Sequence, residues 1–259
     1  MKNIPNLHLT FSLMVFSLSV MIFSSCDTSD TDVSPVGEHN SGQGGSMARF
    51  AISQNHLYTV DLNSLHVYDI SQPDQPVELR SVFVGVNIET IFPRGEHLFI
   101  GSQDGMYIYD ISQPANPTQL SVYRHIVSCD PVVADDQYAY VTLRSVEGMC
   151  GRFTNQLDVV DISQLTAPFL VRTYPMTFPK GLGIDNKTLF VCDDGLKVFD
   201  ATHADSLQLK HHFQIEANDV IPYKGTLMVI GDDGLYQYFY GDTIQLASKL
   251  PFVSVPPAL

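Results

Sequence analysis

Six polar residues occupy equivalent positions of a repeated pattern, and they are the strongest candidates for chemistry in the sequence. Each lies eight or nine residues before the apolar residue of a predicted second strand, which places it at the start of the preceding strand. The residue seven before that apolar position is always apolar, so each of these strands begins polar and continues into a core. The set contains three carboxylates, an amide and two cations: Arg49, Glu89, Asp130, Lys180, Asn218 and Asp219.

Two kinds of ligand chemistry and one structural role are consistent with these residues. Carboxylates and an amide can hold a small polar ligand such as a sugar, whereas charges of both signs can also neutralise one another as an ion-pair network. Glycoside hydrolysis needs an acid and a base, which Glu89, Asp130 and Asp219 could supply. Lys180 and Arg49 would keep neighbouring carboxylates ionised, however, and this disfavours a general acid.

Motifs of the common enzyme classes are absent from the sequence. It contains no Gly-x-Ser-x-Gly, no glycine-rich phosphate loop and no dense cluster of histidine and cysteine. We therefore expect a protein that is not an enzyme, with no catalytic residue, metal ion or cofactor. The expected function is binding of a glycan, peptide or protein partner. A glycoside-processing enzyme and a passive structural scaffold remain the alternatives.

The elements that must position these residues come from an internal repeat. Residues 65–73, 106–114 and 157–165 read LHVYDISQP, MYIYDISQP and LDVVDISQL, and weaker copies begin at Leu196 and Leu235. The aspartates of the first four copies, at positions 69, 110, 161 and 200, are 41, 51 and 39 residues apart. Apolar residues alternate within each copy and many are β-branched or aromatic, which indicates strands. In the middle copy the Asp-Ile-Ser-Gln-Pro run predicts a turn that follows the third strand.

A repeat of this length and pattern predicts an all-β fold, a five-bladed β-propeller of four-stranded antiparallel blades. The predicted propeller spans residues 47–251, followed by a tail at 252–259. Its blades cover about 47–85, 86–125, 126–176, 177–214 and 215–251. In the second blade the strands are expected at 87–93, 97–101, 105–111 and 117–125. Ligands of propellers bind on the axis, where the inner strands converge, so the six polar residues would share one mouth.

The repeated segments resemble LVIVD repeats, a family of bacterial and archaeal cell-surface proteins. The resemblance covers about residues 48–250 and is weaker in the last two copies. It implies a propeller and a surface or periplasmic location. It implies no activity, because the family is functionally uncharacterised.

The N-terminus has the features of a lipoprotein signal peptide. Residues 9–23 form a nearly continuous apolar run, and Ser24 and Ser25 precede Cys26. We expect residues 1–25 to be removed and Cys26 to carry lipid, which anchors the protein in the bacterial cell envelope, in the outer membrane. Residues 26–46 are almost free of apolar side chains beyond the cysteine, so we expect the lipidated end to lead into a flexible tether.

Charge and cysteine content limit the partners further. The net charge of −14 makes nucleic acid an unfavourable partner. We expect a monomer that reaches the membrane only through its lipid. A disulfide between Cys129 and Cys150 would tie an inserted loop to the rim of the same mouth, with Cys192 as the competing partner.

Overall fold

The computed structural model describes residues 44–125, 131–146 and 150–252. The chain divides into two units, residues 1–38 and 39–259, and all described residues belong to the second. Cys26, Cys129 and Asp130 lie outside the described residues, and so does the side chain of Cys150. The lipidation and disulfide predictions therefore stay predictions. In the described part of the chain no helix is long and apolar enough to cross a membrane.

The described residues form twenty strands in five antiparallel sheets, which we call blades 1 to 5. Blade 1 contains β1 (Phe50–Ser53), β2 (His56–Val60), β3 (Ser64–Asp69) and β4 (Val77–Phe83). Blade 2 contains β5 (Ile88–Arg94), β6 (His97–Ser102), β7 (Gly105–Asp110) and β8 (Thr118–Arg124). Blade 3 contains β9 (Val132–Ala134), β10 (Tyr138–Val146), β11 (Cys150–Asp161) and β12 (Phe169–Pro175). Blade 4 contains β13 (Leu182–Asp185), β14 (Thr188–Cys192), β15 (Leu196–Asp200) and β16 (Gln208–Phe213). Blade 5 contains β17 (Asp219–Tyr223), β18 (Thr226–Ile230), β19 (Gly234–Tyr240) and β20 (Ile244–Pro251).

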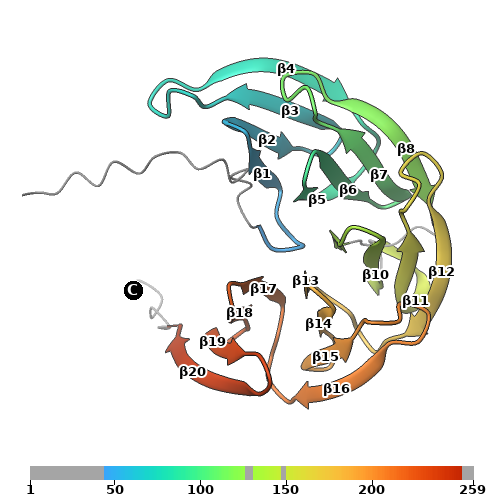
Figure 1. Ribbon diagram of the computed structural model, residues 1–259, viewed down its shortest axis with the longest axis vertical. Helices are drawn as coiled ribbons and strands as arrows, with labels where there is room; N and C mark the ends of the chain where they lie inside the picture. Colours follow the sequence, from blue (N-terminus) through green and yellow to red (C-terminus); the bar gives the residue numbers. More distant parts are fainter. Residues whose placement is uncertain (1–43, 126–130, 147–149, 253–259) are drawn as a thin grey trace, which may run out of the picture. The chain divides into compact units, whose positions relative to one another are not determined.

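This architecture confirms the predicted all-β fold of five four-stranded sheets. In blade 2 each observed strand boundary lies within one residue of its predicted position. Within every blade the strands follow one another in sequence order. The first strands lie around the centre of the propeller and the fourth strands, such as β8 and β16, form its periphery (Figure 1). The inner strands are neighbours in the order β1, β5, β9, β13 and β17.

The repeated aspartates have the structural role that the sequence predicted. Each ends a third strand and accepts a hydrogen bond from the backbone N–H two residues later, as in Asp69 with Ser71 at 2.8 Å. Asp110, Asp161 and Asp200 make the same bond to residues 112, 163 and 202. Backbone N–H donors lower the pKa of Asp69 and Asp110, which fits a carboxylate that holds a turn.

Four hydrophobic clusters join the blades, one at each junction from blade 1 to blade 5. At the first junction, Tyr58 and Val67 of blade 1 pack with Leu98 of blade 2. Blade 2 is buried on both faces, because Leu98 belongs to the first cluster and its neighbour Phe99 to the second. Among the described residues, no such cluster joins blade 5 back to blade 1.

The segment Gly44–Ala48, which we call the strap, connects blade 1 to three other blades. The Ala48 carbonyl accepts the N–H of Ile91 in β5 at 2.9 Å. The Ser46 hydroxyl accepts the N–H of Leu182 at 2.8 Å and donates to Asp219 at 3.1 Å. The predicted tether extended to Ser46, but Gly45 and Ser46 are buried. Gly45 and Ser46 pack against blade 5 because both are small. The space beside Asp219 is so narrow that a Cβ on Gly45 would clash with its carboxyl.

Candidate functional site

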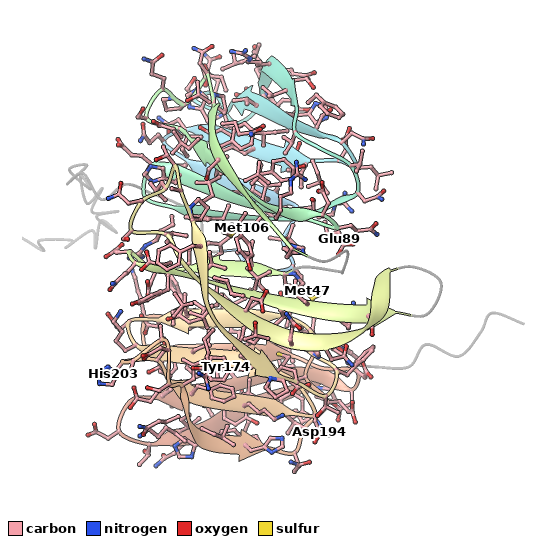
Figure 2. The ribbon with its side chains drawn as sticks, turned by 90° about the vertical axis from the view of Figure 1, so that its right-hand side faces the viewer. Met47, Glu89, Met106, Tyr174, Asp194 and His203 are labelled. Atoms are coloured by element: carbon pink, nitrogen blue, oxygen red, sulfur yellow. The ribbon has the colours of Figure 1, made fainter. Side chains whose placement is uncertain are left out.

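The two ends of the propeller axis present different residues. We call the end where the inner strands begin the start mouth, and the end where they finish the end mouth. Glu89 at the start of β5 and Asp194 in the β14–β15 hairpin lie on one side of the molecule, whereas His203 after β15 lies on the other (Figure 2). Hairpins between second and third strands therefore share the side of the start mouth, because neighbouring strands of each blade are antiparallel.

Three of the six predicted site residues lie close together at the start mouth. Lys180 donates from Nζ to Oδ1 of Asn218 at 2.6 Å, and Asn218 donates from Nδ2 to Oδ1 of Asp232 at 2.6 Å. Asp219 follows Asn218 in the chain and is tied to the strap. These contacts form a connected polar network in blades 4 and 5.

The Asp219 carboxyl is enclosed by the chain itself. Its Oδ1 accepts hydrogen bonds from the Ser46 hydroxyl at 3.1 Å and from the N–H of Val220 at 2.9 Å. Gly45 and Gly181 approach it so closely that a Cβ at either position would overlap the carboxyl oxygens. Burial raises the pKa of Asp219 to about 6. The hydrogen bonds to the carboxyl lower this pKa, but their effect is smaller than that of burial. The carboxyl has the character of a buried anchor for the strap.

The other predicted residues are placed differently. Arg49 turns to the backbone and donates from Nη2 to the Ile88 carbonyl at 3.2 Å. Glu89 is half-buried at an irregularity in the pairing of β5 with β6. Asp130 lies outside the described residues. Cys192, the competitor in the disulfide prediction, is a buried free thiol whose pKa is raised by burial.

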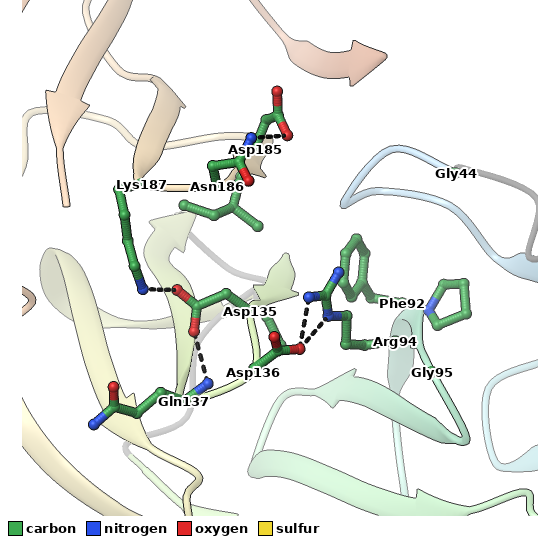
Figure 3. A pocket seen from close by; sticks show the side chains of 13 residues that line it. Gly44, Phe92, Arg94, Gly95, Asp135, Asp136, Gln137, Asp185, Asn186 and Lys187 are labelled. Carbon is green, nitrogen blue, oxygen red and sulfur yellow. Dashed lines mark hydrogen bonds and ion pairs between the residues drawn. The ribbon is translucent and has the colours of Figure 1, made fainter. Parts of the chain in front are cut away.

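The end mouth contains a cavity of about 460 Å³ that the sequence reasoning did not predict (Figure 3). It is built from the last residues of β5, β9 and β13 and from the hairpins that follow these strands. Its apolar lining consists of Phe92, Pro93, Ala134 and Ile184. Its polar rim consists of Arg94, Asp135, Asp136, Gln137, Asp185, Asn186 and Lys187. The strap reaches it through Gly44.

Every charged side chain of this rim has a partner. Arg94 donates from Nη2 and Nε to Oδ1 of Asp136 at 2.6 and 3.1 Å. Lys187 donates from Nζ to Oδ2 of Asp135 at 3.2 Å, and Asp135 also accepts the N–H groups of residues 137 and 138. Asp185 accepts the hydroxyl of Tyr240 at 2.6 Å. Arg94 and Lys187 are about half exposed, so both retain donors that face solvent.

A second hollow of about 520 Å³ lies beside this cavity and shares Arg94, Asp135 and Asp136 with it. The Arg94–Asp136 ion pair therefore lies at the boundary between the two hollows. Within the described residues no group of three or more histidine, cysteine, aspartate or glutamate side chains is arranged to hold a metal ion.

One signal in the sequence could have indicated the end mouth. The repeat that placed Lys180 and Asp219 at strand starts also places Arg94, Asp135 and Asp185 at or just after strand ends. Periodicity assigns residues to a mouth, but it does not predict which mouth contains a cavity. The presence of a cavity depends on how much space the strap and the axial side chains fill.

Comparison with known proteins supports the repeat and the fold. The model of the LVIVD repeat matches residues 44–84, 91–124 and 129–176. No functionally curated protein matches the sequence.

Solved propeller-like structures resemble the chain at low identity. A protein from Lactobacillus plantarum has a TM-score of 0.60 and 16% identity over 75% of this chain and 67% of its own. The periplasmic gluconolactonase PpgL of Pseudomonas aeruginosa has a TM-score of 0.55 and 15% identity over 78% of this chain and 66% of its own. AztD of Citrobacter koseri has a TM-score of 0.56 and 13% identity over 75% of this chain and 59% of its own. The chain thus spans about three fifths to two thirds of these structures, and the likeness concerns the fold.

The prediction that this protein is not an enzyme is contradicted and requires correction. PpgL has a similar fold and is a gluconolactonase, so the fold is compatible with hydrolase activity even without a familiar motif. Of the three carboxylates, Asp219 departs from the expectation that nearby cations keep it ionised: Lys180 bonds to Asn218 and Arg49 to a backbone carbonyl. Burial raises the pKa of Asp219 to about 6.

The repeats and the architecture agree on the family. Three matched repeats fall in blades 1 to 3, and the unmatched copies build blades 4 and 5 with the same strand order. This chain is an LVIVD-repeat protein with the architecture of a five-bladed β-propeller.

Proposed function

We propose that this propeller binds a small, neutral, polyhydroxylated ligand, the size of a sugar unit, in the cavity of the end mouth. The observation that carries the proposal is the combination of an apolar lining with a rim of polar groups that converge on one cavity. The cavity volume of about 460 Å³ lies within the range of roughly 300–1,000 Å³ that is usual for small-molecule sites.

The apolar lining provides a surface for the less polar face of a sugar ring. Phe92 lies on this lining and is packed against the clusters of the second and third junctions. A ring held by packing keeps its position when the ligand arrives, so little entropy is lost on binding.

The rim charges favour a neutral ligand over a charged one. Each of the two cations is paired with an aspartate, and Asp185 is bonded to Tyr240. A charged ligand would have to separate one of these pairs. Hydroxyl groups can instead use the remaining N–H donors and carboxylate lone pairs, because a hydroxyl both donates and accepts.

The test is a glycan array, followed by calorimetric titration of the oligosaccharide that binds best. Lys187→Ala removes a rim donor and should weaken binding about tenfold, which corresponds to roughly 1.4 kcal/mol. Lys249→Ala is the matched control, because Lys249 also pairs with an aspartate, Asp233, and is similarly exposed but does not line the cavity. Equal affinities of the two variants, or no carbohydrate bound at all, would contradict the proposal.

Hydrolysis of a ligand of the same class is the second candidate. One observation favours it: PpgL, named for activity on a sugar lactone, has a similar fold. In this chain the rim carboxylates Asp136 and Asp185 line the cavity and are candidates to act on such a substrate. Acid release from glucono-1,5-lactone at constant pH measures this activity directly. Hydrolysis by the wild type that persists in Asp185→Asn and Asp136→Asn would exclude these two carboxylates as its catalytic groups.

We further propose that the propeller acts at the cell envelope, anchored by lipid on Cys26. The support is the apolar run at residues 9–23, followed by two serines and the cysteine. Metabolic labelling with radioactive palmitate should mark the wild type and not Cys26→Ala. Labelling that is equal in both would refute the anchor.

A further inference from the structure

The second hollow at the end mouth continues outward from the cavity, along the junction of blades 2 and 3. One of its walls is the hairpin that follows β5, with Glu96 and His97. The other wall is the turn that follows β11, with Ser163. Four residues line both this hollow and the cavity: Arg94, Gly95, Asp135 and Asp136. The two spaces therefore share a border, and a ligand longer than the cavity can extend into the second hollow.

The floor of the second hollow is apolar and well packed. Phe99 and Ile162 are 1% and 3% exposed and belong to the cluster that joins blades 2 and 3. Leu165 packs against this cluster and is partly exposed, so it offers apolar surface to a ligand. In the cavity, Phe92 packs against the same cluster and is surrounded by polar groups. Both spaces thus combine apolar side chains with a polar edge, which is the composition of a small-molecule site.

A difference between blades 1 and 2 leaves room for the second hollow. Tyr58 and Phe99 hold equivalent positions in β2 and β6, and each packs toward the next blade. The Tyr58 hydroxyl crosses the first junction to the Pro114 carbonyl at 3.0 Å. Leu165 is the equivalent of Pro114 in blade 3, and its carbonyl accepts the hydroxyl of Ser121. Because Phe99 has no hydroxyl, the bond that ties the two walls at the first junction cannot form at the second.

The Arg94–Asp136 ion pair lies where the two spaces meet, and a ligand in either space can bond to it (Figure 3). Arg94 uses Nε and Nη2 for Asp136, so its other N–H groups can donate to a ligand. The side chains of Arg94 and Asp136 are 48% and 88% exposed, so a ligand that crosses the pair can reach both. The pair has no net charge, which suits the hydroxyl groups and the linking oxygen of a sugar chain.

We propose, on the basis of the function proposed above, that the end mouth binds a neutral oligosaccharide of two or more units. One unit occupies the cavity, the next occupies the second hollow, and their linkage crosses the Arg94–Asp136 pair. The volumes of about 460 and 520 Å³ each lie within the roughly 300–1,000 Å³ of small-molecule sites, so each space can hold a unit of its own. Ser163 and His97 contact the second unit and determine specificity for it.

Calorimetric titration with saccharides of different length tests the proposal. The probes are glucose, galactose, mannose and N-acetylglucosamine, together with the α- and β-linked disaccharides of each. For the sugar that binds, the wild type should hold a disaccharide about tenfold more tightly than the monosaccharide, because the second unit adds hydrogen bonds and apolar contact.

Ser163→Leu places a larger side chain in the wall of the second hollow. It should abolish the gain from the second unit and leave the affinity for the monosaccharide unchanged. Ser112→Leu is the matched control, because Ser112 follows β7 in the same turn, with its N–H bonded to an aspartate two residues earlier, but lines neither space. Circular dichroism establishes folding. If Ser163→Leu is not folded, His97→Ala replaces it, with His56→Ala as control at the equivalent position of blade 1.

The outcomes separate the second unit from the function proposed for the cavity. Equal affinity of the wild type for monosaccharide and disaccharide overturns the second unit and leaves binding in the cavity intact. A gain that persists in the folded Ser163→Leu or His97→Ala variant places the second unit elsewhere and also overturns the proposal. If none of the saccharides binds, the function proposed for the cavity fails, and the second unit fails with it.

Discussion

Replacing Asp219 by asparagine should remove a specific part of the pH dependence of stability. The carboxyl is enclosed by the strap and by Gly181, and burial raises its pKa from 3.8 to about 6. Well below pH 3.8 the group is protonated in both the folded and the unfolded chain, so it does not discriminate between them. Well above pH 6 it is ionised in both, and the folded chain then holds a buried carboxylate.

The magnitude follows from the difference between these pKa values. The folded state binds the proton more tightly, so the free energy of unfolding falls as pH rises from about 4 to 6. A pKa difference of about 2 corresponds to a loss of about 3 kcal/mol, at roughly 1.4 kcal/mol for each tenfold change in proton affinity. Asparagine is neutral throughout, and its oxygen can still accept from Ser46 and from the N–H of Val220.

Urea unfolding at pH 4, 5, 6 and 7, followed by tyrosine fluorescence, measures this effect in a chain with 12 tyrosines and no tryptophan. The difference in unfolding free energy between Asp219→Asn and the wild type should rise by about 2 kcal/mol between pH 4 and pH 7 in favour of the variant, which is most of the total effect. Asp233→Asn is the control, because Lys249 and Tyr236 lower the pKa of Asp233 and no such gain is expected. Parallel pH curves for the wild type and Asp219→Asn would refute a buried carboxyl with a raised pKa.

Two further predictions concern hydroxyl groups. Ser46→Ala removes the donor to Asp219 and the acceptor of the Leu182 N–H, so it should lower the free energy of unfolding by about 1–3 kcal/mol. Urea unfolding measures this loss, and an unchanged midpoint would mean that Ser46 does not hold the strap. Among the described residues the buried Tyr140 hydroxyl has no hydrogen-bond partner, so Tyr140→Phe should leave stability unchanged or raise it by up to about 1 kcal/mol. Tyr58→Phe should lower the free energy of unfolding by about 1 kcal/mol, because the Tyr58 hydroxyl donates to the Pro114 carbonyl at 3.0 Å. Equal melting temperatures of Tyr140→Phe and Tyr58→Phe would contradict both expectations.

The sequence was sufficient for the strands because the repeat is a strong local signal. Alternating apolar residues around each Asp-Ile-Ser segment determine which strand is third, and the spacing of the aspartates determines how many sheets follow. The weaker copies at Leu196 and Leu235 retain the alternation and form β15 and β19. The turns after the third strands of blades 1 to 4 were predictable as well, because an aspartate can bond to its own backbone.

The site was less predictable because it depends on contacts between residues that are far apart in sequence. Ser46 and Asp219 are separated by 173 positions, and no local pattern announces their hydrogen bond. The composition of residues 26–46 indicated a solvated tether, whereas packing of two small residues against β17 makes its end part of the fold. The side chains of Lys180 and Arg49 found neutral partners, which residue types alone could not reveal.

The central claim is that the ligand binds at the mouth where the inner strands end. Hydrogen–deuterium exchange with and without the best-binding oligosaccharide tests this most directly. Slower exchange is predicted in the hairpins at residues 94–97, 135–138 and 185–188, which line the cavity. Protection confined to residues 180–181 and 218–219 at the start mouth would contradict the claim.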